Sequence, residues 1–257
     1  ATGNSMSINQ PFSARRLDEC PEENGFRLRG AEMTRIEVFV DAAFAFALTM
    51  LVIAGDSVPE DFGDMLAALT QVPTFAATFM ILMMFWGAHR RWSRRFGLED
   101  ATVVWLSGFF VFVMLVWVYP LRMVFAGMFH WISAGWLPSP VTLDSYLELR
   151  LLFVFYGAGF FSLSLVVLGL NAHAIRLRDA LGLNAVEAFD TRAEMASWIL
   201  PAGVSLLSVL LAVTLPASLL YLAGVVYFLL AILGPVVGIR QARLRQDLLE
   251  AGHADLG

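Results

Sequence analysis

Six long apolar segments constrain this chain more than any other feature. A helix needs about 20 mostly apolar residues to cross a bilayer, and segments of this kind lie near 35–54, 65–88, 101–121, 149–174, 195–214 and 217–239. Hydrophobic residues make up 58% of the 257 residues and charged residues only 15%, whereas a soluble protein carries about 25% charged residues. The sequence therefore predicts an all-α membrane protein with six transmembrane helices.

The arginines between the segments predict how the helices are oriented. The connection after the second segment holds Arg90, Arg91, Arg94 and Arg95, whereas the loop after the first segment holds four acidic and no basic residues. The positive-inside rule then places both termini in the cytoplasm. All 17 basic residues are arginine, which indicates a bacterium with GC-rich DNA, so we expect the bacterial inner (cell) membrane.

The ends of the chain are expected to be tails. A cytoplasmic N-terminal tail covers 1–34, a six-helix transmembrane domain covers 35–240, and a cytoplasmic C-terminal tail covers 241–257. The polar lead before the first apolar segment exceeds thirty residues and carries both charge signs, unlike a signal peptide. Cys20 is the single cysteine, so an internal disulfide and a thiolate metal site are excluded for one chain. We expect no bound metal and no cofactor.

One carboxylate interrupts the first apolar segment. Asp41 lies six residues after Arg35 in "RIEVFVDAAFAFALTMLVIAG", which places it roughly 9 Å deeper along a helix. A carboxylate at the centre of a lipid-facing helix costs roughly 3 kcal/mol on insertion scales. The second segment ends in "FWGAHRRWSRRF", and the opposite direction of that helix puts Trp86, His89 and Arg90 at a similar depth.

Two interpretations of this polar group remain open. Arg35, His89 and Arg90 are candidate partners of Asp41, and an acid with a base and an indole donor nearby can fix helix register. The group is then a structural salt bridge, which we favour, or part of a proton relay. The arginine run from Arg90 to Arg95 is best explained by topology and by attraction to anionic lipids. No nucleic-acid partner is expected.

Two motifs resemble one known family. Arg35, Phe39 and Asp41 stand in the spacing R-x-x-x-F-x-D, which resembles the R-x-x-x-F-S-D signature that opens the first helix of the transmembrane protein 175 potassium-channel family. "LAALTQVPTFAATFMILMMFWGAHRRWSRRF" is similar to that family's proline-containing helix ending in W-x-x-H-H-R-x-F. Pro120, closing the third span, and Pro201 in the fifth fit the later pattern, so the resemblance covers most of 35–240.

The resemblance implies a potassium channel of four six-helix subunits, in which the first helix of each subunit lines a central pore. Potassium is then the transient ligand. Three residues match the family's pore-facing hydrophobic layers, with a threonine beside them: Phe46, Met50, Ile53 and Thr49. The spacing of the three agrees, because residues i, i+4 and i+7 share one helical face. Five residues match the polar network behind the pore helix: Arg35, Phe39, Asp41, Trp86 and His89.

Three positions depart from the family pattern. Val40 replaces the signature serine, Arg90 replaces the second histidine, and Phe46 stands where the family has isoleucine or leucine. Four phenyl rings would close a pore more tightly than four aliphatic side chains. Because the carbonyl filter sequence TVGYG is absent from the sequence, ions would pass hydrophobic rings, which gate by dewetting. We therefore expect a potassium-selective or weakly selective cation channel.

Three other functions compete with the channel. A proton-coupled transporter using Asp41 and His89 ranks second, although the paired broken helices of such transporters are not evident in the sequence. A non-conducting membrane scaffold ranks third, and Phe46 is its best support. A membrane enzyme ranks last, because the sequence offers neither a nucleophile–base set nor clustered metal ligands.

Overall fold

The computed structural model describes residues 17–30, 32–53, 60–139 and 143–254, with the side chains of 53 and 251–254 left out. Residues 1–16 of the expected N-terminal tail and 255–257 of the C-terminal tail lie outside the described residues. The described elements are a two-stranded hairpin and a series of helices: β1 (Glu22–Glu23), β2 (Phe26–Arg27), α2 (Arg35–Ile53), α3 (Phe62–Thr70), α4 (Val72–Phe96), α5 (Ala101–Ile132), α6 (Tyr146–Arg176), α7 (Arg178–Leu181), α8 (Ala185–Thr214), η1 (Ala217–Leu219), α9 (Leu222–Val225) and α10 (Phe228–Ala254).

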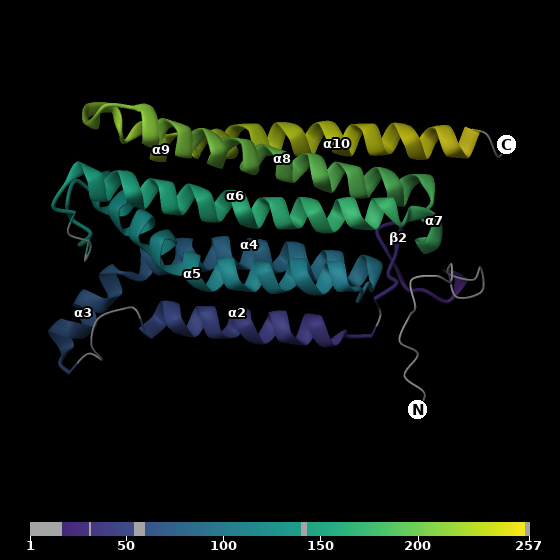
Figure 1. Ribbon diagram of the computed structural model, residues 1–257, viewed down its shortest axis with the longest axis horizontal. Coiled ribbons are helices and arrows are strands. Elements are labelled where there is room, and N and C mark those ends of the chain that lie inside the picture. The colour runs from purple at the N-terminus through teal and green to yellow at the C-terminus, as the bar shows by residue number, and fades with distance from the viewer. Residues whose placement is uncertain (1–16, 31, 54–59, 140–142, 255–257) are drawn as a thin grey trace.

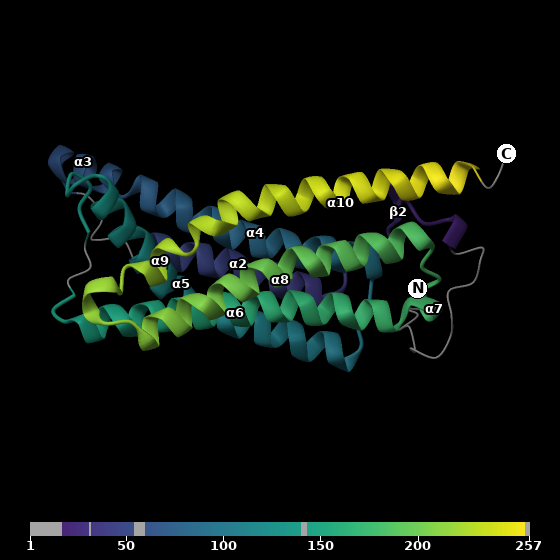
Figure 2. The ribbon, with the colours of Figure 1, turned by 90° about the horizontal axis from the view of Figure 1, so that it is seen from above.

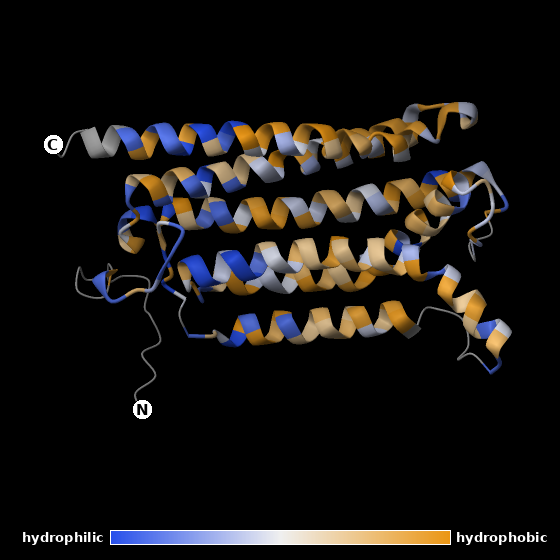
Figure 3. Ribbon diagram, turned by 180° about the vertical axis from the view of Figure 1, so that it is seen from behind, coloured by the Kyte–Doolittle hydropathy of each residue, from blue (hydrophilic) through white to orange (hydrophobic). Residues whose placement is uncertain are grey.

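The long helices form a bundle with α2 at one edge and α10 at the other (Figure 1). Along the bundle, α2 packs against α4 and α5, α5 against α6, α6 against α8, and α8 against α10. Figure 2 shows the same helices lying lengthwise from a second direction. The hairpin and the last turns of α10 lie at the same end, where hydrophilic residues gather on the ribbon (Figure 3).

Five segments of the described residues are long and apolar enough to cross a membrane: Val72–Phe96, Ala101–Ile132, Tyr146–Arg176, Ala185–Thr214 and Ala217–Glu250. Each overlaps one predicted segment. The first predicted segment corresponds to α2, which is not among the five and carries Arg35, Glu37 and Asp41 in its first two turns. The all-helical membrane fold is thus confirmed.

Pro120 does not close the third helix, contrary to the prediction. It lies inside α5, which continues to Ile132. Proline removes one backbone N–H and disfavours a helix interior in water. Neighbouring helices and local adjustments make it tolerable in a membrane helix, so a proline there is a weak stop signal.

Aromatic rings hold the centre of the bundle together. Phe85 of α4 is fully buried. Its ring centroid lies 5.8 Å from that of Trp117 on α5, 5.3 Å from Phe160 on α6 and 5.2 Å from Trp198 on α8. These spacings lie within the range of favourable aromatic pairs. A single side chain therefore joins four of the long helices.

The hairpin is held to the bundle by a buried ion cluster. The carboxylate of Glu187 in α8 accepts from Arg27 Nη2 and Arg29 Nη2, each at 2.8 Å. The side chains of Arg29 and Glu187 are both 0% exposed. The hydrogen bond to Glu187 raises the pKa of the Arg27 guanidinium, although burial opposes it. This cluster ties the segment just before α2 to the start of α8.

The turn between α4 and α5 carries a second tie. Asp100 caps α5 by accepting from the N–H of Val103, and its other oxygen lies 2.5 Å from His173 Nε2 at the end of α6. Burial raises the pKa of Asp100, but the hydrogen bonds from His173 and Val103 outweigh it and hold the pKa below its ordinary value. The turn is thereby fixed against α6.

Glu187→Gln tests the ion cluster. The amide keeps the size of the side chain but leaves two guanidiniums without their counter-charge, one of them fully buried. Breaking a buried pair in this way costs about 3 kcal/mol, so the thermal unfolding midpoint in detergent should fall clearly. Asp179→Asn is the control, because Asp179 pairs with Arg178 while 92% exposed, and such pairs contribute little. Equal midpoints for Glu187→Gln and wild type would show that the cluster does not hold the hairpin.

Candidate functional site

The two faces of α2 have different environments. Val40, Phe44, Ala47 and Leu51 are buried, and this spacing places them on one helical face. The face meets α4 and α5, with the Phe44 ring centroid 5.7 Å from that of Phe110 on α5. The apolar contacts of the subunit thus use only one side of α2.

The other face of α2 is open in the isolated subunit. Phe39, Phe46 and Val52 are large apolar side chains more than half exposed, with Phe46 at 56%. Thr49 is exposed as well and donates to the carbonyl of Ala45 at 2.9 Å. Among the predicted pore residues, Phe46 and Thr49 therefore lie on this open face.

Met50 is placed at the edge of this face, and the placement of Ile53 stays untested. Met50 is half-buried, and its Sδ lies 3.9 Å from the hydroxyl of Tyr119 on α5, at the border between the two faces. Ile53 is the last residue of α2, and its side chain lies outside the described residues. Phe39, assigned to the polar network by resemblance, points out on the open face with 52% exposure.

The structure brings Asp41 and Trp86 together. The indole Nε1 of Trp86 donates to Asp41 Oδ1 at 2.7 Å, a short charge-assisted hydrogen bond. The Arg90 guanidinium carbon lies 5.2 Å from the Trp86 ring centroid. The carboxylate in the first apolar segment therefore has a donor on α4.

His89 and Arg35 have other partners. His89 is buried, with Nε2 2.9 Å from the hydroxyl of Ser107 on α5 and its ring stacked on Phe110. The backbone N–H of Arg35 donates to Glu99 at 3.0 Å. Within the described ranges, no ion pair joins Arg35 or His89 to Asp41. Three of the five network residues are thus separate from the Asp41–Trp86 contact.

A second polar contact between α2 and α4 was not predicted. Ser93 Oγ donates to Glu37 Oε2 at 3.1 Å, with both side chains buried. Glu37 lies one turn before Asp41, and Ser93 lies seven residues after Trp86, so each pair shares a helical face. These two spacings were the feature of the sequence from which the Glu37–Ser93 contact could have been predicted. Among the described residues, no group of three histidine, cysteine or acidic side chains is placed to hold a metal ion.

Most of this chain, including α2 and α4, matches known proteins. The family model described as endosomal/lysosomal potassium channel TMEM175 matches residues 35–120, from α2 to Pro120 in α5. A protein named potassium channel, from Marivirga tractuosa, is 33% identical over 236 residues, which are 86% of this chain and 94% of the relative. The chain belongs to the TMEM175 potassium-channel family.

Solved structures of this family resemble the fold. The crystal structure of a variant of the potassium channel MtTMEM175, in complex with a nanobody–MBP fusion protein, superposes with a TM-score of 0.72 at 30% identity. The superposition covers 86% of this chain and 99% of the MtTMEM175 chain. A lysosomal potassium-selective TMEM175 homologue from Chamaesiphon minutus gives a TM-score of 0.52 at 20% identity, covering 80% and 96% of the two chains. At this identity, the Chamaesiphon minutus structure supports a similarity of fold alone.

A double-mutant cycle tests the Asp41–Trp86 contact. Trp86→Phe removes the indole donor, and Asp41→Asn removes the charge that strengthens the bond. Hydrogen bonds to charged groups contribute about 1.5–3 kcal/mol, so each change should lower the unfolding midpoint in detergent. The double variant should lose less than the sum of the two losses. Trp105→Phe is the control, because it removes an exposed indole on α5, and it should have little effect on the unfolding midpoint. Strictly additive losses at Asp41 and Trp86 would contradict the contact.

Proposed function

We propose that this protein is a potassium-selective or weakly selective cation channel whose pore is lined by α2 of four subunits. The observation that carries the proposal is the open apolar face of α2, with Phe46 and Thr49 on it, at the edge of the bundle. Membership of a potassium-channel family supports it. A helix buried on one side only, with an apolar row on the other, is suited to line a shared axis.

In this proposal α2 is the sixth transmembrane helix. Its 19 residues would span roughly 28 Å, close to the hydrocarbon thickness, and it runs along the other long helices (Figure 1). The end with the hairpin and the last turns of α10 holds Arg90, Arg91, Arg94 and Arg95. The positive-inside rule makes that end cytoplasmic, so both tails lie in the cytoplasm of a bacterial cell with the channel in its inner membrane.

The open face of α2 supports a homotetramer. Large exposed apolar patches mark interaction sites, and in a membrane protein this face meets either lipid or another subunit. Four copies around one axis would bring the Phe46 side chains close to each other, with Thr49 one turn further along. Met50 and Ile53 would follow at the border of the same path.

Phe46 would form the narrowest ring. Phenyl rings around a four-fold axis exclude water, and an ion cannot cross a dry apolar ring without losing its hydration. The Thr49 hydroxyl, next along the helix, would help to rehydrate an ion that has passed. The channel would therefore rest closed or weakly conducting, and potassium would bind only in transit.

The polar contacts behind α2 act as a structural lock. Asp41–Trp86 and Glu37–Ser93 fix the rotation of α2 against α4, so that Phe46 points to the axis. Arg35, Phe39 and His89 would flank this lock. His89 shares a hydrogen bond with Ser107 and not with Asp41, which favours this role over a proton relay, and hence a channel over a transporter.

The basic end of α4 would meet the cytoplasmic leaflet. Arg90 with Arg94 and Arg91 with Arg95 form two i, i+4 pairs, which lie on adjacent stripes of the helix. Anionic lipid surfaces attract such residues. The four arginines would therefore orient the subunit and draw anionic lipids to it.

Potassium and sodium flux from liposomes tests the function and the role of Phe46. Phe46→Ala should raise flux and lower the preference for potassium, because a wider ring admits water and hydrated ions. Phe228→Ala is the matched control, since Phe228 has 52% exposure against 56% for Phe46 but starts α10 at the opposite edge of the bundle. The control should resemble wild type.

Two outcomes would contradict the proposal. If Phe46→Ala and wild type have the same flux and selectivity, Phe46 is not the constriction. If neither protein passes either cation, the channel function itself is overturned.

A further inference from the structure

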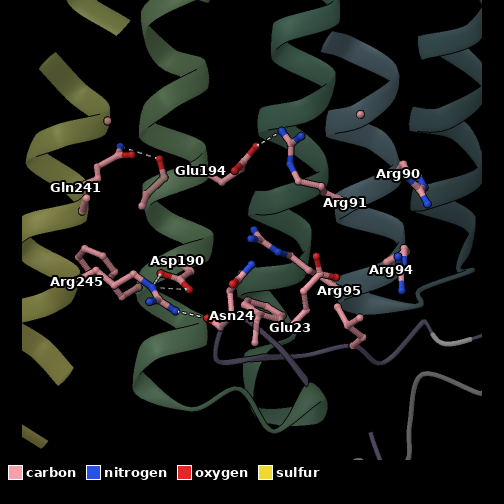
Figure 4. A pocket seen from close by; sticks show the side chains of 17 residues that line it. Glu23, Asn24, Arg90, Arg91, Arg94, Arg95, Asp190, Glu194, Gln241 and Arg245 are labelled. Carbon is pink, nitrogen blue, oxygen red and sulfur yellow. Dashed lines mark hydrogen bonds and ion pairs between the residues drawn. The ribbon is translucent and has the colours of Figure 1, made fainter. Parts of the chain in front are cut away.

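A cavity of about 490 Å³ lies at the basic end of the bundle, between the hairpin, α4, α8 and α10 (Figure 4). Its charged lining consists of five arginines and three carboxylates: Arg90, Arg91, Arg94, Arg95, Arg245, Glu23, Asp190 and Glu194. The lining therefore has an excess of two positive charges. None of these residues takes part in the proposed pore.

Two of the three carboxylates are already paired. Arg245 Nε lies 2.9 Å from Asp190 Oδ1, and Arg91 Nη2 lies 3.3 Å from Glu194 Oε1. Among the described residues, the other three arginines of the cavity have no carboxylate partner. The cavity thus keeps guanidinium donors free for an anion.

Arg95 is the best placed of these donors. Its guanidinium carbon lies 4.8 Å from the ring centroid of Phe26, and stacking on an aromatic ring holds a guanidinium while its N–H groups stay available. Arg95 on α4 and Arg245 on α10 come from opposite walls of the cavity (Figure 4). The planar fork of an arginine matches the oxygens of a phosphate.

The cavity also extends toward the apolar part of the bundle. Its lining includes Gly87 of α4 and Gly238 of α10, which precede Arg95 and Arg245 by about two helical turns, or roughly 10–12 Å. A Cβ added to Gly238 would meet no atom within 4 Å. The cavity thus combines its basic lining with an open groove beside Gly238.

We propose that this cavity binds an anionic phospholipid, with its phosphate at Arg95 and an acyl chain in the groove beside Gly238. The recognised group is a phosphate ester, which a soluble organic phosphate also carries. The groove favours the lipid, because a soluble phosphate has nothing to place there. This site rests on the proposed meeting of the α4 arginines with the cytoplasmic leaflet and gives that attraction a defined site, and it does not depend on ion conduction.

The site lies beside the chain that leads to α2. The N–H of Arg29 donates to the carbonyl of Arg95 at 3.3 Å, and that of Gly30 donates to Arg94 at 3.0 Å. A lipid held by Arg95 would therefore stabilise the attachment of the hairpin to α4. A ligand that binds only the folded protein raises its unfolding midpoint, and the rise grows with the logarithm of the ratio of ligand concentration to dissociation constant.

The test is a titration of the unfolding midpoint of the full-length protein in detergent. Dioleoyl phosphatidylglycerol should raise the midpoint saturably, and dioleoyl phosphatidylcholine should not. Arg95→Gln should weaken the apparent affinity for phosphatidylglycerol about tenfold, as expected for loss of one charged contact. Gly238→Leu should also weaken it by filling the groove. Arg178→Gln, at the same end but outside the cavity lining, should leave it unchanged.

A parallel titration with inorganic phosphate separates the two sources. If phosphate stabilises the protein as strongly as the lipid, and Gly238→Leu has no effect on either, the lipid assignment is overturned. If phosphatidylglycerol binds wild type, Arg95→Gln and Gly238→Leu alike, the whole site is overturned. Should Arg95→Gln not fold, Gly238→Leu decides alone, because its side chain enters open space.

Discussion

The contact between α2 and α4 is the constraint on which the rest of the structure depends. Asp41 must have a partner in an apolar segment, and the indole of Trp86 supplies it at 2.7 Å, while Ser93 does the same for Glu37. Both contacts lie on one side of α2. They therefore set the rotation of the helix and leave Phe46 and Thr49 facing away from the subunit.

The cytoplasmic end in our proposal is built to keep α2 in that position. The hairpin before α2 is held by Glu187 through two buried or half-buried arginines, and its last strand continues along the carbonyls of Arg94 and Arg95. Arg94 and Arg95 also line the cavity that we assign to a phospholipid. Membrane composition and the attachment of α2, which we propose to line the pore, would thus be linked through a few side chains.

Much of the fold followed from the sequence because apolar length alone marks membrane helices. The nearness of Asp41 and Trp86 followed from their equal depth on adjacent helices, but the predicted partners of Asp41 were Arg35, His89 and Arg90, whereas the structure gives the Trp86 indole. The pairing of His89 with Ser107 did not, because it depends on how α5 packs beside α4. The Glu187 cluster joins residues about 160 positions apart, which no local pattern encodes. The Asn24-Gly25 turn, with positive φ at both residues, was a local hairpin signal that went unused.

The central claim is that the open face of α2 lines the ion path. The most direct measurement is potassium flux after treatment with a cationic methanethiosulfonate reagent, using Thr49→Cys in a Cys20→Ser background. We expect the modified protein to lose most of its flux, because a bulky cation would then occupy the pore beside the Phe46 ring. Val225→Cys, on α9, which packs against α8 and not against α2, should keep its flux. Complete modification at position 49, verified by mass spectrometry, with unchanged flux would contradict the account.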